Sequence, residues 1–205
     1  MSDDTAPPSF MSGRMRRLVV LLAALAVLVV VRPLFIETYT VPSSSMVPTL
    51  SPGDRIAVRK HVRVERGDLV VFTADEAFYG GAPDQGLLRR IGDWFGIRPG
   101  EHVYVKRVIA LPGDRVSVDR AGVLRVEGKV QAEPYLRAGV LASTTAFSIR
   151  VPQGRYFVMG DNRPASDDSR NHLGDPGGGS VRAEDIVGVV VWRYWPSAGW
   201  GSVES

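Results

Sequence analysis

The sequence predicts a mostly β protein in which the folded domain follows an apolar N-terminal segment. Short apolar stretches recur between turn signals from residue 54 onward, and helical periodicity is scarce, with one candidate over 85–96. Strands do not alternate with helical stretches, which argues against a parallel sheet built from strand–helix–strand units. An apolar fraction of 44% in 205 residues is sufficient for a buried core.

The N-terminal segment has the charge pattern of a membrane anchor. A polar tail over 1–17 ends in an arginine cluster, and an uninterrupted apolar run follows over 18–31. We expect a single transmembrane helix over 18–36 with the N-terminus in the cytoplasm, because basic residues favour that side. Residues 37–205 would then form an extracytoplasmic domain at the plasma membrane.

Two other interpretations of the apolar run remain open. A cleaved signal peptide has the same charged start, but the residues that follow the run, RPLFIETYT, contain no Ala-x-Ala-like cleavage site. A buried core helix suits the length of the run, although such a helix normally keeps a polar face.

Each expected strand is an apolar or alternating stretch that ends at a turn signal. RIAVRKHVRV alternates as a half-buried strand does, and GDLVVF is a turn followed by a buried strand. A hairpin is expected over 114–131, inside a small β subdomain at about 115–150. The stretch at about 74–100 is expected to be an insertion. The expected strands cover 55–64, 67–72, 101–111, 147–161 in two pieces, and 185–196.

Composition excludes several kinds of chemistry. The chain has no cysteine, so disulfides, thiolate zinc sites and a cysteine nucleophile are excluded. The 25 basic and 22 acidic residues are interspersed and give a formal charge of +3, so nucleic acid is not an expected partner. Three scattered histidines give no metal-ligand spacing, and we expect neither a metal nor a cofactor.

Lys106 is the strongest candidate for a general base. It is one of three lysines, and the other two, Lys60 and Lys129, lie among charged residues or after a turn glycine. In YVKRVIAL both strand faces are largely apolar, so Lys106 projects from an apolar face. Desolvation lowers the pKa of such an amine, which can then accept a proton near neutral pH. The simpler alternative is a packed stem with a solvated amine.

Three serines at 43–45 lie between Pro42 and Pro48 in the stretch VPSSSMVPTL. A serine hydroxyl is a poor nucleophile without an adjacent base, and serine–lysine pairs are one known solution. The prolines fix φ and stiffen the loop, which suits a preorganised site. A polar turn without chemistry is the alternative for the triplet by itself.

Four motifs that follow the apolar segment closely resemble those of type I signal peptidases of the peptidase S26 family. They are VPSSSMVPTL, RGDLVVF, YVKRVIALPGDRV and GDNRPASDDSR, and the resemblance runs to about residue 196. It implies a membrane-anchored serine endopeptidase with an antiparallel β-sheet catalytic domain and a small β-hairpin insertion. Such an enzyme removes N-terminal signal peptides from exported preproteins after small-x-small sites such as Ala-x-Ala, through an acyl-enzyme.

The resemblance implies a role for each hydroxyl of the triplet. Ser45, which precedes the methionine, corresponds to the nucleophile, and Lys106 to its general base. Ser43 corresponds to the hydroxyl that forms an oxyanion hole with the backbone N–H of Ser45. Ser44 occupies a position that requires a small residue.

The resemblance also implies a set of residues that support the lysine. Ser166 corresponds to the serine that orients the lysine amine, with Asp168 and Arg170 behind it. Arg107 and Asp161 correspond to a structural ion pair.

The implied substrate is an extended peptide that adds to an exposed sheet edge. The preprotein signal peptide, the lipid bilayer and a nearby secretion translocon are the implied partners. Aromatic residues near the C-terminus could lie at the lipid interface or pack at a strand end. The expected walls of the substrate pocket are Val41, Pro42, Met46, Tyr104 and Val105.

Three alternatives to this function remain open. The first is a Ser-His-Asp triad that uses His172. The second is a processing peptidase dedicated to a pilus or conjugation subunit. The third is a non-catalytic, membrane-anchored β module that binds peptides.

Overall fold

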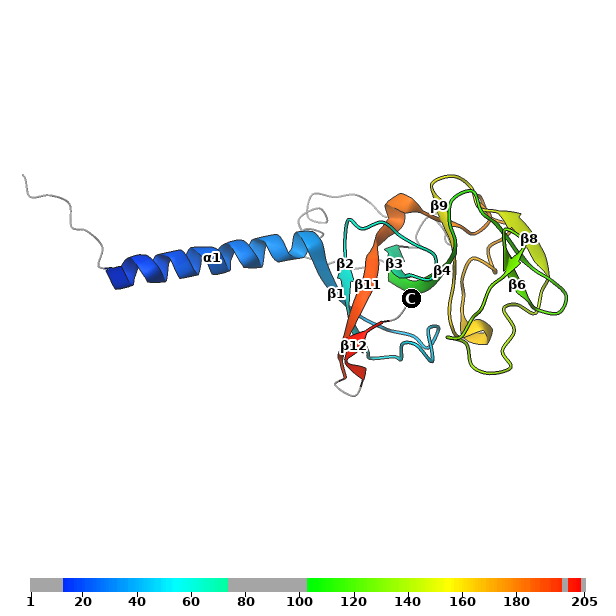
Figure 1. Ribbon diagram of the computed structural model, residues 1–205, viewed down its shortest axis with the longest axis horizontal. Coiled ribbons are helices and arrows are strands. Elements are labelled where there is room, and N and C mark those ends of the chain that lie inside the picture. Colours follow the sequence, from blue (N-terminus) through cyan, green and yellow to red (C-terminus); the bar gives the residue numbers. More distant parts are fainter. Residues whose placement is uncertain (1–12, 74–102, 197–198, 204–205) are drawn as a thin grey trace, which may run out of the picture.

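The computed structural model describes residues 13–73, 103–196 and 199–203. Figure 1 shows one long helix that projects from a domain built of two β-sheets. The insertion expected at about 74–100 and the helical candidate over 85–96 lie outside the described residues.

The N-terminal helix differs from the expected anchor. Helix α1 (Gly13–Phe35) begins within the expected tail and leads directly into β1 (Ile36–Thr40). In the part of the chain that the structure describes, no helix has both the length and the apolar character needed to cross a membrane. The transmembrane anchor expected over 18–36 is therefore not confirmed. The expected anchor also ended one residue too late. The helix ends at Phe35, and Ile36 is the first residue of β1, where it pairs with Arg59.

The larger sheet is antiparallel and has the strand order β1-β2-β11-β3-β4-β9-β10, with β12 paired to β11. Two 3-10 turns, η1 (Arg163–Ala165) and η2 (Ala183–Asp185), flank β10 in sequence. Besides β1, the strands are β2 (Arg55–Arg59), β3 (Leu69–Thr73), β4 (Val103–Ala110), β9 (Arg155–Met159), β10 (Val181–Arg182), β11 (Ile186–Trp195) and β12 (Gly201–Ser202).

The smaller sheet is also antiparallel and covers the range expected for the small β subdomain. Its strand order is β7-β6-β5-β8. Residues of both sheets, such as Phe157 on β9 and Val116 on β5, share one buried apolar cluster, which joins the two sheets. The strands are β5 (Arg115–Val118), β6 (Leu124–Val126), β7 (Lys129–Val130) and β8 (Phe147–Arg150).

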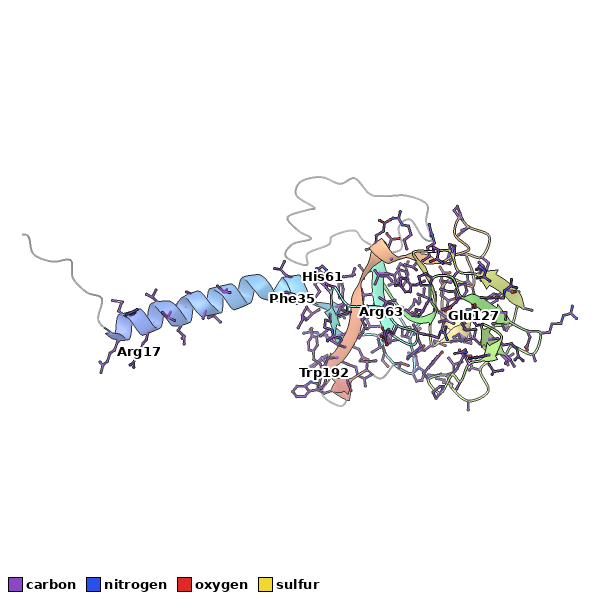
Figure 2. The ribbon with its side chains drawn as sticks, turned by 45° about the horizontal axis from the view of Figure 1, so that its top comes forward. Arg17, Phe35, His61, Arg63, Glu127 and Trp192 are labelled. Atoms are coloured by element: carbon purple, nitrogen blue, oxygen red, sulfur yellow. The ribbon has the colours of Figure 1, made fainter. Side chains whose placement is uncertain are left out.

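The strand expected over 55–64 ends early, at Arg59. The N–H of Lys60 donates a 2.9 Å hydrogen bond to the carbonyl of Phe35, and His61 takes a positive φ of 54°, so extended pairing stops there. In Figure 2, Phe35 and His61 lie together where α1 meets the β domain.

The aromatic residues near the C-terminus lie on the surface. Figure 2 shows Trp192 on β11, near the end of the larger sheet. These side chains do not lie in the core, because each of them is at least 37% exposed. The lipid interface and packing at the strand end both stay predictions. The aromatic residues are Trp192, Tyr194, Trp195 and Trp200.

Strand β4 lies inside the larger sheet, between β3 and β9. Val105 and Val108 belong to two different buried apolar clusters, so both faces of the strand are covered. Lys106 and Arg107, which point to opposite faces, are buried as well. The central strand expected around YVKRVIAL is confirmed, and it carries two cations into the interior.

Candidate active site

The serine triplet lies on a loop between β1 and β2 that is anchored by buried apolar side chains. Met46 and Leu50 are 1% and 0% exposed, and the N–H of Leu50 donates to the carbonyl of Met46 at 2.9 Å. Ser45 is 8% exposed, whereas Ser43 and Ser44 face solvent. The hydroxyl oxygens of Ser43 and Ser45 are 3.2 Å apart, so the loop brings two of the three hydroxyls together.

Lys106 carries its amine into the interior of the domain. It pairs with Val70 of β3, and only 2% of the residue is exposed. Burial lowers the pKa of Lys106 from its ordinary 10.5 to about 8, against the attraction of Asp168 and Asp167. The neutral form of the amine, which can accept a proton, is therefore far more populated near pH 7 than in a solvated lysine.

Arg107, next along β4, points to the other face and forms a buried ion pair with Asp161. Its Nε and Nη2 donate to the two carboxylate oxygens of Asp161 at 3.0 and 2.9 Å. Thr49 Oγ1 donates to the same carboxylate at 2.5 Å. The guanidinium also lies 4.0 Å from the ring centre of Tyr135. The pair thus ties the serine loop to β4.

The segment after β9 folds around a second carboxylate, that of Asp168. Arg170 donates to both of its oxygens at 2.8 Å, and the N–H of Gly160 donates at 2.9 Å. Burial by itself would raise the pKa of Asp168, but the hydrogen bonds and charge of Arg170 outweigh it and hold this pKa below its ordinary value. A fully buried negative charge therefore lies close enough to Lys106 to favour its charged form.

Ser166 and the serine loop meet at Gly160. A Cβ on Gly160 would lie 2.1 Å from Ser166 Oγ and 2.6 Å from the carbonyl oxygen of Ser45, so a side chain does not fit there. The hydroxyl of Ser166 is buried beside Asp168, whose pKa it helps to hold below the ordinary value. Its expected role toward Lys106 stays a prediction.

Asn162 holds the serine loop through two hydrogen bonds. Its backbone N–H donates to the carbonyl of Ser45 at 2.9 Å, and its side-chain Nδ2 donates to the carbonyl of Ser44 at 3.0 Å. Two consecutive peptide groups of the serine loop are therefore fixed by one residue.

An apolar cavity of about 280 Å³ adjoins the Ser45 hydroxyl. Its lining includes every residue that was expected as a wall of the substrate pocket, and also Val103 from the start of β4. Valine, proline and methionine side chains dominate the lining, so the cavity suits small apolar groups. The lining residues are Val41, Pro42, Ser43, Ser45, Met46, Val103, Tyr104 and Val105.

The imidazole of His172 interacts with two carboxylates of its own loop. Its Nδ1 lies 2.8 Å from a carboxylate oxygen of Asp175, and its Nε2 lies 3.1 Å from one of Asp167. Both ring nitrogens therefore face carboxylates, and neither is directed at Ser45, which argues against the triad alternative.

Sequence reasoning missed several residues that hold the site together. Tyr135 lies outside the four motifs, and the others lie inside or beside one of them, where nothing local distinguishes them from their neighbours. What identifies these residues is their contact with segments that are distant in sequence, and such contacts are seen only in the folded structure. These residues are Thr49, Val103, Tyr135, Gly160 and Asn162.

The model of the family described as "Signal peptidase, peptidase S26" matches residues 14–195. A signal peptidase I of Bacillus amyloliquefaciens is 36% identical over 188 residues, which cover 86% of this chain and 82% of the relative. A probable signal peptidase I of Mycobacterium leprae is 34% identical over 205 residues, which cover 82% of this chain and 71% of the relative. A crystal structure of a signal peptidase I from Enterococcus faecalis is similar with a TM-score of 0.42 and 24% identity, over 62% of this chain and 97% of that one.

Proposed function

The chain belongs to the signal peptidase family, peptidase S26, and is a serine endopeptidase. We propose that it removes signal peptides from exported preproteins, with Ser45 as nucleophile and Lys106 as general base. Two observations support this proposal: the pKa of the buried Lys106 amine falls to about 8, and Tyr104 and Val105 of the same strand line a cavity together with Ser45.

In the proposed reaction the Ser45 hydroxyl attacks the carbonyl carbon of the scissile bond, and the Lys106 amine accepts its proton. The ammonium then protonates the leaving amine of the mature chain, and an acyl-enzyme remains on Ser45. A water molecule then gives a proton to the neutral Lys106 and attacks the ester carbonyl. The Lys106 ammonium returns that proton to the Ser45 oxygen as the ester bond breaks, and the signal peptide leaves with a new carboxyl group. Asp168, fully buried, attracts the ammonium that forms in each half-reaction.

The charge that develops on the substrate oxygen requires hydrogen-bond donors. The Ser43 hydroxyl, 3.2 Å from the Ser45 hydroxyl, is one proposed donor, and the backbone N–H of Ser45 is the other. A single donor of this kind is typically worth about 10²–10³ in rate.

The preference for small side chains follows from the cavity beside Ser45. β9 pairs with β4 from Arg107 onward, and the preceding residues Val103, Tyr104 and Val105 line the cavity beside Ser45. An extended peptide that lies along this part of β4 would direct alternate side chains into the apolar cavity. Walls of valine, proline and methionine favour small apolar side chains, as in the proposed Ala-x-Ala site.

The proposal is tested with purified full-length protein and a preprotein that carries an Ala-x-Ala site. We expect cleavage directly after the second alanine, and no cleavage when either alanine is replaced by a large residue. Binding of the preprotein without cleavage would contradict the proposal. Cleavage restricted to one pilus or conjugation subunit among several preproteins would support the dedicated-client alternative instead.

A further inference from the structure

We propose that Asn162 orients the oxyanion hole by holding the peptide group between Ser44 and Ser45. This inference rests on the proposed function, because it assigns the backbone N–H of Ser45 to the developing oxyanion. Asn162 is thus a positioning residue that acts through a backbone group and does not touch the substrate.

The argument begins with the planarity of one peptide bond. The carbonyl of Ser44 and the N–H of Ser45 belong to the same peptide group, and in a trans peptide they point in opposite directions. The Nδ2 of Asn162 donates to that carbonyl at 3.0 Å. A donor that fixes the carbonyl on one side therefore fixes the direction of the Ser45 N–H on the other.

A second donor reaches the same carbonyl oxygen. The N–H of Val47 donates to Ser44 at 3.1 Å, within the turn of the serine loop. Meanwhile the backbone N–H of Asn162 holds the next carbonyl, that of Ser45, at 2.9 Å. Three hydrogen bonds thus restrict rotation of the peptide planes on both sides of the Ser45 α-carbon.

The side chain of Asn162 donates to the Ser44 carbonyl and does not make the local capping hydrogen bond that is usual for an asparagine at its position. Asn162 occupies the N-cap position of η1, where an asparagine side chain ordinarily accepts a hydrogen bond from the following turn. No such capping bond forms, although the backbone carbonyl of Asn162 still accepts from Ala165 at 2.9 Å. The amide is instead turned toward the serine loop.

Asn162 can act as a clamp because its chain neighbours are themselves fixed. Asp161 is held by Arg107 and Thr49, and the N–H of Gly160 is held by Asp168. A donor mounted on this segment therefore keeps its place relative to the loop. A misplacement of about 1 Å in such a group can lower a rate by about 10²-fold.

The test measures kcat, KM and the pH profile of preprotein-derived peptide cleavage by full-length protein. We expect Asn162→Ala to lower kcat by about 10- to 100-fold with KM within about twofold of wild type. Asn162→Asp should lower kcat at least as much, because a carboxylate cannot donate and repels the Ser44 carbonyl. In Asn162→Ala the apparent pKa of the pH profile should stay at the wild-type value, because this change adds no charge near the base.

Asn171→Ala is the matched control, because the Asn171 side chain donates to Asp167 in the same segment. Its kcat should equal that of wild type. Thermal melting of each variant reports folding, and Asn162→Asp, which keeps the shape of the side chain, serves as the second variant if Asn162→Ala does not fold.

Three results would overturn the inference. The first is wild-type kcat in both Asn162 variants, in a preparation where wild type cleaves and Ser45→Ala does not; this result leaves the proposed function intact. The second is a raised KM or a shifted apparent pKa without a loss of kcat. The third is loss of folding in both variants. Failure of wild type itself to cleave would overturn the proposed function and the inference together.

Discussion

Arg107 and Asp161 form a two-bond ion pair in which the side chains are 1% and 0% exposed. The pair connects β4, beside the candidate base, to the segment that carries Asn162. Thr49 donates to the same carboxylate, so the serine loop joins the network. Three segments that are far apart in sequence therefore meet at one buried carboxylate.

Replacing one partner of this pair should lower the free energy of unfolding of the protein. Arg107→Met leaves the Asp161 carboxylate buried with Thr49 as its remaining side-chain partner, and such a change typically costs about 3–5 kcal/mol. Urea denaturation should show the lower midpoint. The double variant Arg107→Met with Asp161→Leu should recover part of the loss, because no uncompensated charge remains. Equal stability of the single and double variants would show that the pair is not the cause.

A methyl group at residue 160 should strongly lower the kcat of peptide cleavage. In Gly160→Ala the new Cβ would lie 2.1 Å from Ser166 Oγ and 2.6 Å from the carbonyl oxygen of Ser45, so the serine loop must move. We expect kcat to fall by about 10²-fold or more. Gly174→Ala is the control, because its Cβ would meet nothing within 4 Å. Wild-type turnover in Gly160→Ala would contradict the close packing described here.

The pH dependence of cleavage should follow the amine of Lys106. Only the neutral amine accepts a proton, so kcat/KM should rise with pH through an apparent pKa near 8 and level off above it. A stopped-time peptide assay between pH 6 and pH 10 measures this, with the two limits chosen to lie about two units either side of that value. A profile that rises only near the pKa of a solvated lysine would contradict a buried base.

Removing the buried amine should stabilise the protein. The pKa of Lys106 is about 8 in the folded state and 10.5 ordinarily, so between these values the unfolded state binds more protons and stability rises with pH. Below about pH 8 the cost of the buried charge is fully present. Lys106→Met removes it, and its free energy of unfolding at pH 7 should exceed that of wild type by about 3 kcal/mol.

The comparison of Lys106→Met with wild type at two pH values isolates this effect. The difference in free energy of unfolding should shrink as pH approaches 10.5, the ordinary pKa of the amine, because both states of the wild type then lose the proton. A difference that is independent of pH would assign the gain to packing.

Local patterns were sufficient to predict the candidate base and the strand around it. The alternation of YVKRVIAL places Lys106 on an apolar face, and the structure buries it. The start of β1 was missed because Ile36 reads as a continuation of the apolar run, although it pairs with Arg59. The early end of β2 was missed because His61, with its positive φ, continues an alternating pattern.

The contacts that complete the site could not be predicted from local patterns. Asn162 is one polar residue among many in GDNRPASDDSR, and its role depends on the serine loop lying within 3.0 Å of its amide. Gly160 looks like a turn glycine, yet the space it leaves is filled by Ser166 and Ser45. Both depend on how distant segments pack against each other.

Cleavage of an Ala-x-Ala preprotein by wild type, Ser45→Ala and Lys106→Met tests the central claim most directly. All three proteins should melt cooperatively, so that a loss of activity reports chemistry and not folding. We predict that wild type cleaves after the second alanine and that both variants lose turnover by about 10³-fold or more, as expected when a nucleophile or its base is removed. Turnover near the wild-type rate in either variant would contradict the serine–lysine mechanism.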